Sequence, residues 1–206
     1  MNEETLSSGF FGEDITLDIY TDLKEFYTPA NGFSRLHLCR RYGKLHILKS
    51  LQPFYSSQEF YKQLLLKEFN IGYQLDHPNI RHTLGWEKND LLGNYIVLEY
   101  IDGIPLTTFI EQGKLTQALA YKFITEICNA LQYIHSKQLI HKDLKPNNIL
   151  ITHNGNNVKL IDFGLADCDD YEILKIPAGT EKYLAPEQLN PNATLDCRTD
   201  IYSLGI

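Results

Sequence analysis

The chain has 206 residues, of which 43% are hydrophobic and 22% are charged, close to the average for soluble globular proteins. These proportions exclude wholesale disorder and collagen-like or coiled-coil architectures, because the chain can bury a real core. The formal net charge of −7 disfavours a nucleic-acid partner, since binding to a phosphate backbone requires a basic surface.

The sequence carries no signal of export or of membrane insertion. Its four cysteines lie far apart and form no C-x-x-C pair, which favours reduced thiols and a cytoplasmic location. The acidic segment 1–14 lacks the basic and apolar regions of a secretory signal. No run approaches the roughly 18 apolar residues of a transmembrane helix, so we expect no membrane segment in this stretch.

The first half of the chain predicts mainly strands and one helix. Residues 1–22 are expected to form a loosely ordered lead-in. Alternating residues predict strands from about Leu23 to Leu51, around a turn at Arg41–Lys44. A capping-box pattern at Ser56–Glu59 predicts the start of a helix, which His77-Pro78 would end. Its core-facing row would contain Leu64, Leu65, Ile71 and Leu75.

A change in periodicity follows the apolar strand predicted at Tyr95–Tyr100. Asp102–Pro105 has the composition of a turn and is interpreted as a linker between two domains. Beyond it, Thr116 is predicted to cap a helix. The apolar stripe of this helix would contain Phe123, Ile127, Ala130 and Ile134, widened by Ile124, Cys128 and Leu131.

Two short apolar runs, 149–151 and 158–161, flank Asn154-Gly155 and predict a β-hairpin. Asn148 directly precedes the first run and Asp162 directly follows the second, so both side chains should reach the same end of the hairpin. A carboxylate and a carboxamide at one place suit Mg²⁺. Such a pair alone would more often cap turns, but Asp143 and Lys145 lie just upstream and add a base and a cation.

Glu68 is the second unusual residue, because it falls on the apolar row of the predicted helix. A carboxylate that faces the core is costly unless a cation meets it. Lys49 is the natural partner, since it shares a strand face with Leu45 and Ile47. The alternative is that Lys49 and Glu68 are two unrelated surface residues whose stems lie on the protein surface.

Several segments, in order, resemble the motifs of eukaryotic-type protein kinases. The run from His141 to Asn148 resembles the catalytic loop usually written H-R-D-L-K-P-E-N. Asp162-Phe163-Gly164 matches the D-F-G element, and His46–Lys49 stands where V-A-I-K belongs. Further matches are Glu68 at the position of the helix glutamate, Gly179-Thr180 and Tyr183, Ala185-Pro186-Glu187 for A-P-E, and Asp200–Gly205 for the start of the central C-lobe helix.

The resemblance implies an α+β, two-lobed fold of the protein-kinase type. Residues 23–98 would form a small β-rich N-lobe with one helix, and residues 99–103 would form a hinge. Residues 104–206 would form a mainly helical C-lobe that is incomplete, because the helices that normally complete this lobe do not follow. The chain is therefore expected to be a fragment, with the apolar face meant for those helices exposed.

The resemblance also implies ATP and Mg²⁺ as cofactors and assigns a role to each matching residue. Asp143 would accept the proton of the substrate hydroxyl and Lys145 would steady the transferring phosphoryl group. Asn148 and Asp162 would hold Mg²⁺. The nucleotide would be bound by Lys49 oriented by Glu68, by the backbone of Glu99 and Ile101, and by Leu36 and Leu150 on either side of the adenine ring.

Some positions depart from the family pattern. The glycine-rich loop, at 29–36, keeps only Gly32, although close backbone approach to phosphates is what glycine provides there. Ile47 replaces the small residue that would lie under adenine, and Lys142 replaces an arginine. Gly72 stands at a helix position where the family packs an apolar side chain.

Three functions fit these motifs. The first is a serine/threonine protein kinase acting on a protein substrate, because Lys-Pro after Asp143-Leu144 resembles serine/threonine rather than tyrosine kinases. The second is a pseudokinase that acts as a nucleotide-binding or scaffold module, which the poor glycine-rich loop favours. The third is a small-molecule kinase, although Gly179-Thr180 and Ala185–Glu187 are typical of a peptide-binding segment. Nothing in the sequence indicates an oligomeric state.

Overall fold

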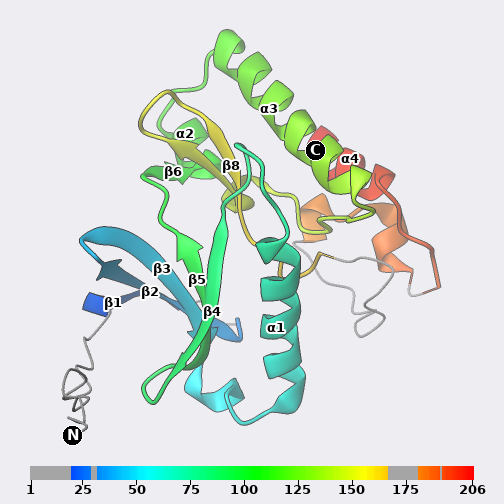
Figure 1. Cartoon of the computed structure of the whole chain (residues 1–206). Helices are drawn as coiled ribbons and strands as arrows, with labels where there is room; N and C mark the ends of the chain where they lie inside the picture. The colour runs from blue at the N-terminus through cyan, green and yellow to red at the C-terminus, as the bar shows by residue number, and fades with distance from the viewer. Residues whose placement is uncertain (1–19, 29–31, 167–180, 191) are drawn as a thin grey trace, which may run out of the picture.

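The computed structural model describes residues 20–28, 32–166, 181–190 and 192–206. An antiparallel sheet with one helix forms the N-terminal part, and a small sheet with most of the helices forms the remainder (Figure 1). This is the two-lobed α+β architecture that the sequence predicted. Among the described residues no helix is both long enough and apolar enough to span a bilayer.

The N-terminal sheet is five-stranded, in the order β1-β2-β3-β5-β4, and all its neighbouring strands are antiparallel. Tyr42 and Gly43 both have positive φ, which is the geometry of a tight hairpin turn between β2 and β3. The first strand begins earlier than the predicted start near Leu23, and β4 was not predicted at all. The strands are β1 (Tyr20–Tyr27), β2 (Ser34–Arg41), β3 (Lys44–Leu51), β4 (Thr83–Asn89) and β5 (Gly93–Glu99).

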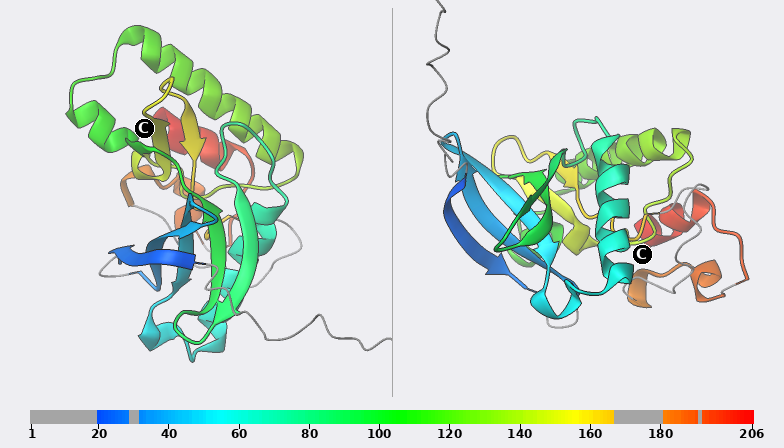
Figure 2. Two further views of the ribbon diagram at one scale, coloured as in Figure 1. Left: turned by 60° about the vertical axis from the view of Figure 1, so that its left-hand side comes forward. Right: turned by 60° about the horizontal axis from the view of Figure 1, so that its bottom comes forward.

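Helix α1 (Glu59–Tyr73) lies beside this sheet (Figure 2). Its predicted capping box is wrong: Gln58 is the N-cap and makes no side-chain cap bond. Ser56 instead donates its hydroxyl to the Pro53 carbonyl at 2.7 Å, within a short 3₁₀ helix that precedes α1. The predicted core-facing row is confirmed, since all its members are buried: Leu64, Leu65, Ile71 and, just past the end of the helix, Leu75.

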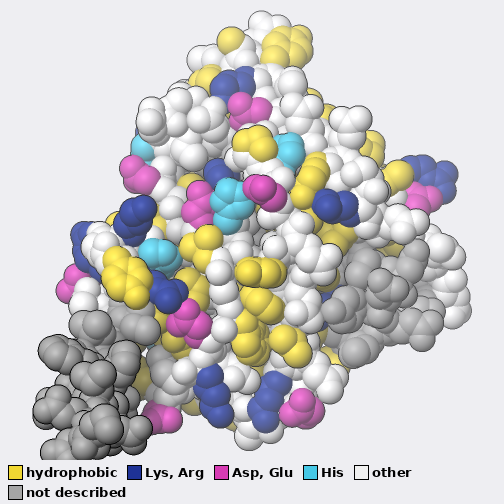
Figure 3. Space-filling model, viewed as in Figure 1, with side chains coloured by type: hydrophobic (Ala, Val, Ile, Leu, Met, Phe, Trp, Pro, Cys, Tyr) yellow, Lys and Arg dark blue, Asp and Glu magenta, His cyan; other side chains and the backbone are white. Residues whose placement is uncertain are grey.

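Gly72 on α1 lies directly against Thr83, the first residue of β4. A Cβ atom at Gly72 would lie 2.3 Å from the Thr83 hydroxyl oxygen and 3.3 Å from its Cβ, so an apolar side chain does not fit. This explains the glycine at a position where the family packs a larger residue. On the outside, hydrophobic side chains gather over α1 and β4 (Figure 3), and these elements carry the exposed residues Leu66, Tyr73 and Leu84.

We therefore expect Gly72→Ala to destabilise the fold, although alanine is the better helix former. The clash with Thr83 should outweigh a helix-propensity gain of about 1 kcal/mol and leave a net loss of about 1–2 kcal/mol. Urea unfolding of the single variant and of Gly72→Ala/Thr83→Ala tests this, because removing the Thr83 side-chain atoms should recover most of the loss. A single variant that is more stable than wild type would contradict the close packing.

The second sheet is three-stranded, in the order β6-β7-β8. Its strands are β6 (Gly103–Pro105), β7 (Ile149–Thr152) and β8 (Val158–Leu160). The β7–β8 hairpin was predicted, with Gly155 at φ 80° in its turn. The turn indicated by the composition of Asp102–Pro105 is wrong for its last three residues, because β6 pairs with β7. Gly103 makes this possible, since a Cβ there would lie 2.4 Å from the Ile151 carbonyl oxygen.

The helices of this part are α2 (Leu106–Glu111), α3 (Gln117–Ser136) and α4 (Arg198–Gly205). Thr116 caps α3 as predicted, by accepting a hydrogen bond from the Leu119 N–H. The main stripe of α3 is buried, and so is Leu131, but Ile124 and Cys128 are exposed and do not widen it. Short 3₁₀ helices occupy Pro146–Asn148, Glu181–Tyr183 and Pro186–Leu189.

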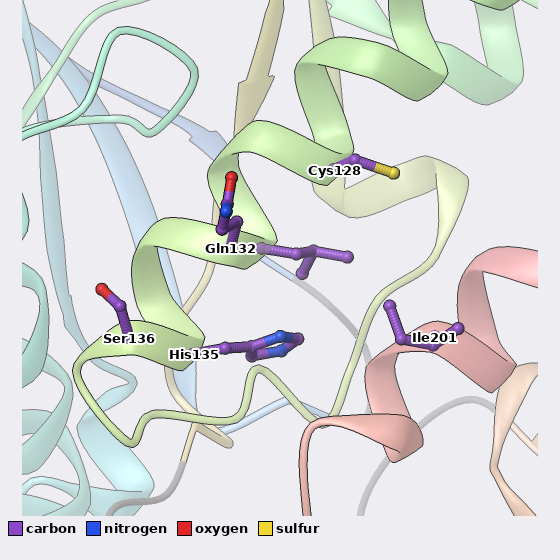
Figure 4. A pocket seen from close by; sticks show the side chains of 6 residues that line it. Cys128, Gln132, His135, Ser136 and Ile201 are labelled. Atoms are coloured by element: carbon purple, nitrogen blue, oxygen red, sulfur yellow. The ribbon is translucent and has the colours of Figure 1, made fainter.

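An open apolar cavity of about 480 Å³ lies between α3 and α4 (Figure 4). The cavity explains why Cys128 does not belong to the buried stripe of α3 as predicted. Its side chain lines the cavity and does not pack into the core. Its lining residues come from one face of α3 and from Ile201 of α4, and they are Cys128, Leu131, Gln132, His135, Ser136 and Ile201. The cavity is therefore a feature of the helical part and contains none of the predicted site residues.

Candidate active site

The β7–β8 hairpin brings the predicted site residues together from distant parts of the chain. Asn148 ends the 3₁₀ helix before β7, and its carbonyl accepts a hydrogen bond from the Ile161 N–H at 3.0 Å. Asp162 is therefore adjacent to Asn148 at the same end of the hairpin, as the sequence predicted. Two side-chain clusters are built on this junction, one around Lys49 and one around Asp143.

The first cluster is an ion-pair network between three elements. Lys49 Nζ on β3 lies 2.7 Å from Glu68 Oε1 on α1 and 3.1 Å from Asp162 Oδ1 after β8. Lys49 and Glu68 are almost fully buried, whereas the Asp162 side chain is 42% exposed. The predicted Lys49–Glu68 ion pair is thus confirmed, and the alternative of two unrelated surface residues is wrong.

Lys49 and Asp162 hold each other in the ionised state, whereas the pKa of Glu68 shifts the other way. Burial acts to lower the pKa of Lys49, but the carboxylates of Asp162 and Glu68 outweigh it and leave that pKa above its ordinary value. Burial acts to raise the pKa of Asp162, yet Lys49 and its hydrogen bond hold it well below the ordinary range. For Glu68 burial prevails over Lys49, so its pKa is raised.

Gly164 lets the backbone approach both carboxylates. A Cβ at Gly164 would lie 3.2 Å from Asp162 Oδ1 and 3.2 Å from Glu68 Oε2. The Gly164 N–H donates to Asp162 Oδ1 at 3.3 Å. Asp162 itself has φ 67°, a left-handed backbone conformation that its neighbours must stabilise. The glycine of this motif is therefore needed for space beside the carboxylates.

The second cluster surrounds Asp143, whose side chain is mostly buried. Lys145 Nζ lies 2.7 Å from Asp143 Oδ2 and 3.0 Å from Oδ1. The Asn148 amide donates at 2.8 Å both to Asp143 Oδ2 and to the Asp143 carbonyl. A carboxylate held this way has a fixed orientation and keeps acceptor capacity for a hydroxyl proton.

Asp200 anchors the loop that carries Asp143, and it was not among the predicted site residues. Its fully buried carboxylate accepts hydrogen bonds from the N–H groups of His141 and Lys142, each at 2.9 Å, and lies 2.8 Å from His135 Nε2. Lys142 has φ 65°, a strained conformation that these bonds stabilise. Its motif was visible in the sequence, but only the fold shows what its carboxylate binds.

Asp200→Asn should cost about 3 kcal/mol of unfolding free energy, because an amide would present a donor to N–H donors in a buried site. Burial acts to raise the pKa of Asp200. The hydrogen bonds from His135 and from the two N–H groups act more strongly in the other direction and leave that pKa below its ordinary value. Its contribution is therefore present above about pH 4 and fades as the pH falls through the depressed folded pKa. Urea unfolding at pH 7 measures the loss, and Asp76→Asn, at a 96% exposed side chain, is the matched control.

Asn148 and Asp162 have the chemistry of a Mg²⁺ site. The Asn148 NH₂ group donates to Asp143, which leaves the side-chain oxygen of Asn148 free to act as a ligand. The partly exposed carboxylate of Asp162 supplies a further oxygen ligand. Within the described residues there is no group of three His, Cys, Asp or Glu side chains suited to a metal. A metal held here would thus depend on oxygens from a bound nucleotide and water, as Mg²⁺ commonly does.

The residues predicted to contact adenine come from both sheets. Leu36 on β2 packs in the N-terminal core with Ile47 and Leu98, and Leu150 lies on β7 of the second sheet. Glu99 ends β5, and Ile101 follows it on the connection to β6. Of the glycine-rich loop, residues 29–31 lie outside the described residues, as do Gly179 and Thr180 of the later motif.

Comparison with known proteins agrees with this geometry. Residues 32–206 match the family model described as the protein kinase domain. A probable serine/threonine-protein kinase of Clostridium perfringens is 35% identical over 82% of this chain, and PrkC, a serine/threonine-protein kinase of Bacillus subtilis, is 34% identical over 77%. Calcium-dependent protein kinase 5 of Plasmodium falciparum is 40% identical over 69%. The matches cover 25% of each of these relatives. The chain belongs to the protein kinase family.

Proposed function

We propose that the full-length protein transfers the γ-phosphoryl group of ATP, bound with Mg²⁺, to serine and threonine hydroxyls of protein substrates. The observation that carries this proposal is the Lys49–Glu68 ion pair, which also reaches Asp162. It shows that β3, α1 and the end of the hairpin are assembled around one point, next to the held Asp143 carboxylate. Phosphoryl transfer needs such positioning and charge neutralisation more than covalent chemistry.

Each residue has a role that its contacts support. Asp143 accepts the proton of the attacking hydroxyl, and Lys145 neutralises charge on the transferring group. Asn148 and Asp162 hold Mg²⁺, which supplies charge neutralisation at the phosphates when bound. Lys49 binds the α- and β-phosphates in the orientation that Glu68 sets. Leu36, Leu150 and the backbone of Glu99 and Ile101 form the adenine site.

Serine and threonine are favoured over tyrosine by Lys145-Pro146 and by the similarity of this chain to serine/threonine-protein kinases. The second candidate is a pseudokinase that binds nucleotide without transferring phosphate. The observation in its favour is the glycine-rich loop, which retains only Gly32. That change weakens the grip on the phosphates but leaves Asp143 and Asp162 in place, so we favour the active kinase.

The organisation of the lobes and the cellular location are also proposals. We propose an N-lobe up to residue 98, a hinge at 99–103 and part of the C-lobe at 104–206. The boundary expected between the lead-in at 1–22 and the N-lobe at 23–98 falls inside β1, so we place the start of the N-lobe at Tyr20. The end of β5 at Glu99 and the start of β6 at Gly103 support this hinge. Free thiols at Cys39, Cys128 and Cys197 support a cytoplasmic domain.

The test is a transfer assay on full-length protein with radiolabelled ATP, Mg²⁺ and a generic basic protein, followed by identification of the modified amino acid. Phosphoserine or phosphothreonine supports the proposal. Phosphotyrosine, or transfer only to small molecules, contradicts it. A shift of the melting temperature by Mg-ATP without transfer to any acceptor identifies the pseudokinase instead.

A further inference from the structure

The Lys49–Glu68–Asp162 cluster contains one more negative than positive charge. A single ammonium group serves both Glu68 and Asp162, so one positive charge faces two carboxylates. Glu68 Oε2 is buried and has no hydrogen-bond partner among the described residues. Since a buried carboxylate oxygen without a partner is unfavourable, a second positive charge close to Glu68 would stabilise this cluster.

Arg81 lies two residues before β4. Its N–H donates to the Leu160 carbonyl at 2.9 Å, which ties it to the end of β8. Thr83 packs against Gly72, which lies one turn after Glu68 on the same face of α1. Hydrogen bonding between β4 and β5 continues just before β4, so this segment is extended. Arg81 and Thr83 therefore point to the same side, toward the face that carries Glu68.

The electrostatics of Arg81 agree with this placement. Burial lowers the pKa of its guanidinium, while the carboxylates of Asp162, Glu68 and Glu99 act in the opposite direction. The charge of Arg81 in turn lowers the pKa values of Glu68 and Asp162, which burial raises. Because a guanidinium stays protonated in proteins, Arg81 is a permanent second positive charge.

We propose that Arg81 is a positioning residue that balances the second carboxylate of the Lys49–Glu68–Asp162 cluster. It keeps Glu68 docked against β3, so that Glu68 can orient Lys49 toward the nucleotide phosphates. The effect on nucleotide binding rests on the proposed function. The charge balance does not, because it concerns the protein without nucleotide.

The first arm of the test is therefore thermal unfolding of nucleotide-free, full-length protein. Arg81→Met should lower the melting temperature by about 4 °C or more, because it leaves the cluster with a net negative charge. In a Glu68→Gln background the same substitution should lower it by less than half as much, because one carboxylate is already gone. Equal losses in both backgrounds would show that Arg81 does not compensate Glu68.

Arg81→Lys tests whether charge, and not packing, is responsible. Lysine keeps the positive charge but carries a smaller head group than arginine, so the melting temperature of this variant should stay close to that of wild type. A loss as large as that of Arg81→Met would overturn the proposal. This variant also keeps the question open to measurement if Arg81→Met does not fold.

The second arm measures the dissociation constant of Mg-ADP by calorimetry. Arg81→Met should weaken binding by about tenfold, since Glu68 no longer holds Lys49 in place. The matched control is Arg41→Met, which removes a partly buried arginine that lies 2.8 Å from Glu87, and it should leave binding unchanged. Unchanged binding in Arg81→Met contradicts the positioning role. If wild type binds no Mg-ADP, the proposed function fails, while the unfolding arm still decides the charge balance.

Discussion

Replacing Asp143 by asparagine in the full-length protein should lower kcat by about 10²–10⁴-fold and leave the affinity for ATP nearly unchanged. The reason is that the amide keeps the shape of the side chain and can still accept a bond from Asn148, but it cannot take a proton from a hydroxyl. Asp143 also shares no hydrogen bond or ion pair with Lys49 or Glu68, which are the residues proposed to orient the phosphates. Radiolabelled transfer assays give kcat, and calorimetry gives the dissociation constant.

The control for Asp143 is Asp76→Asn, the same chemical change at a side chain that is 96% exposed. It should retain wild-type kcat. Equal activity of wild type and Asp143→Asn would remove Asp143 from the chemistry. A parallel loss of ATP affinity would instead show that the substitution disturbs the nucleotide site, and would contradict the separation of the two clusters.

Asp162→Asn should lower kcat by at least about 10²-fold, through the loss of a charged metal ligand at the transferring phosphoryl group. The sharper expectation concerns binding. In wild type, Mg²⁺ should strengthen the binding of ADP, because Asp162 and Asn148 hold the ion against the phosphates. In the variant this strengthening should largely disappear, since an amide oxygen is a much weaker ligand for Mg²⁺ than a carboxylate.

Calorimetric titration of ADP with and without Mg²⁺ measures this effect. Asp76→Asn is the matched control, because Asp76 is also a carboxylate in an ion pair, 3.2 Å from His82 Nε2, and belongs to neither side-chain cluster. It should keep the full magnesium dependence. The same magnesium dependence in Asp162→Asn and wild type would contradict the assignment of Asp162 as a ligand.

Local sequence signals were reliable where a single element decides the outcome. Thr116 as a helix cap, the buried row of α1 and the β7–β8 hairpin all depend on residues within a few positions of one another. The same local reasoning was wrong at Ser56–Glu59, where a preceding 3₁₀ helix uses the Ser56 hydroxyl. It was wrong at Gly103–Pro105, where turn-forming residues pair as a strand with a distant partner.

The motifs of the chain are enough to identify the family, and the Lys49–Glu68 pair could be predicted from them because a carboxylate in an apolar row demands a cation. The surroundings of that pair depend instead on how separate elements pack. The buried carboxylate of Asp200 beneath the catalytic loop and the contact between Gly72 and Thr83 both join residues that are distant in the chain. No periodicity encodes such contacts, since they arise when separate elements pack and their charges must balance.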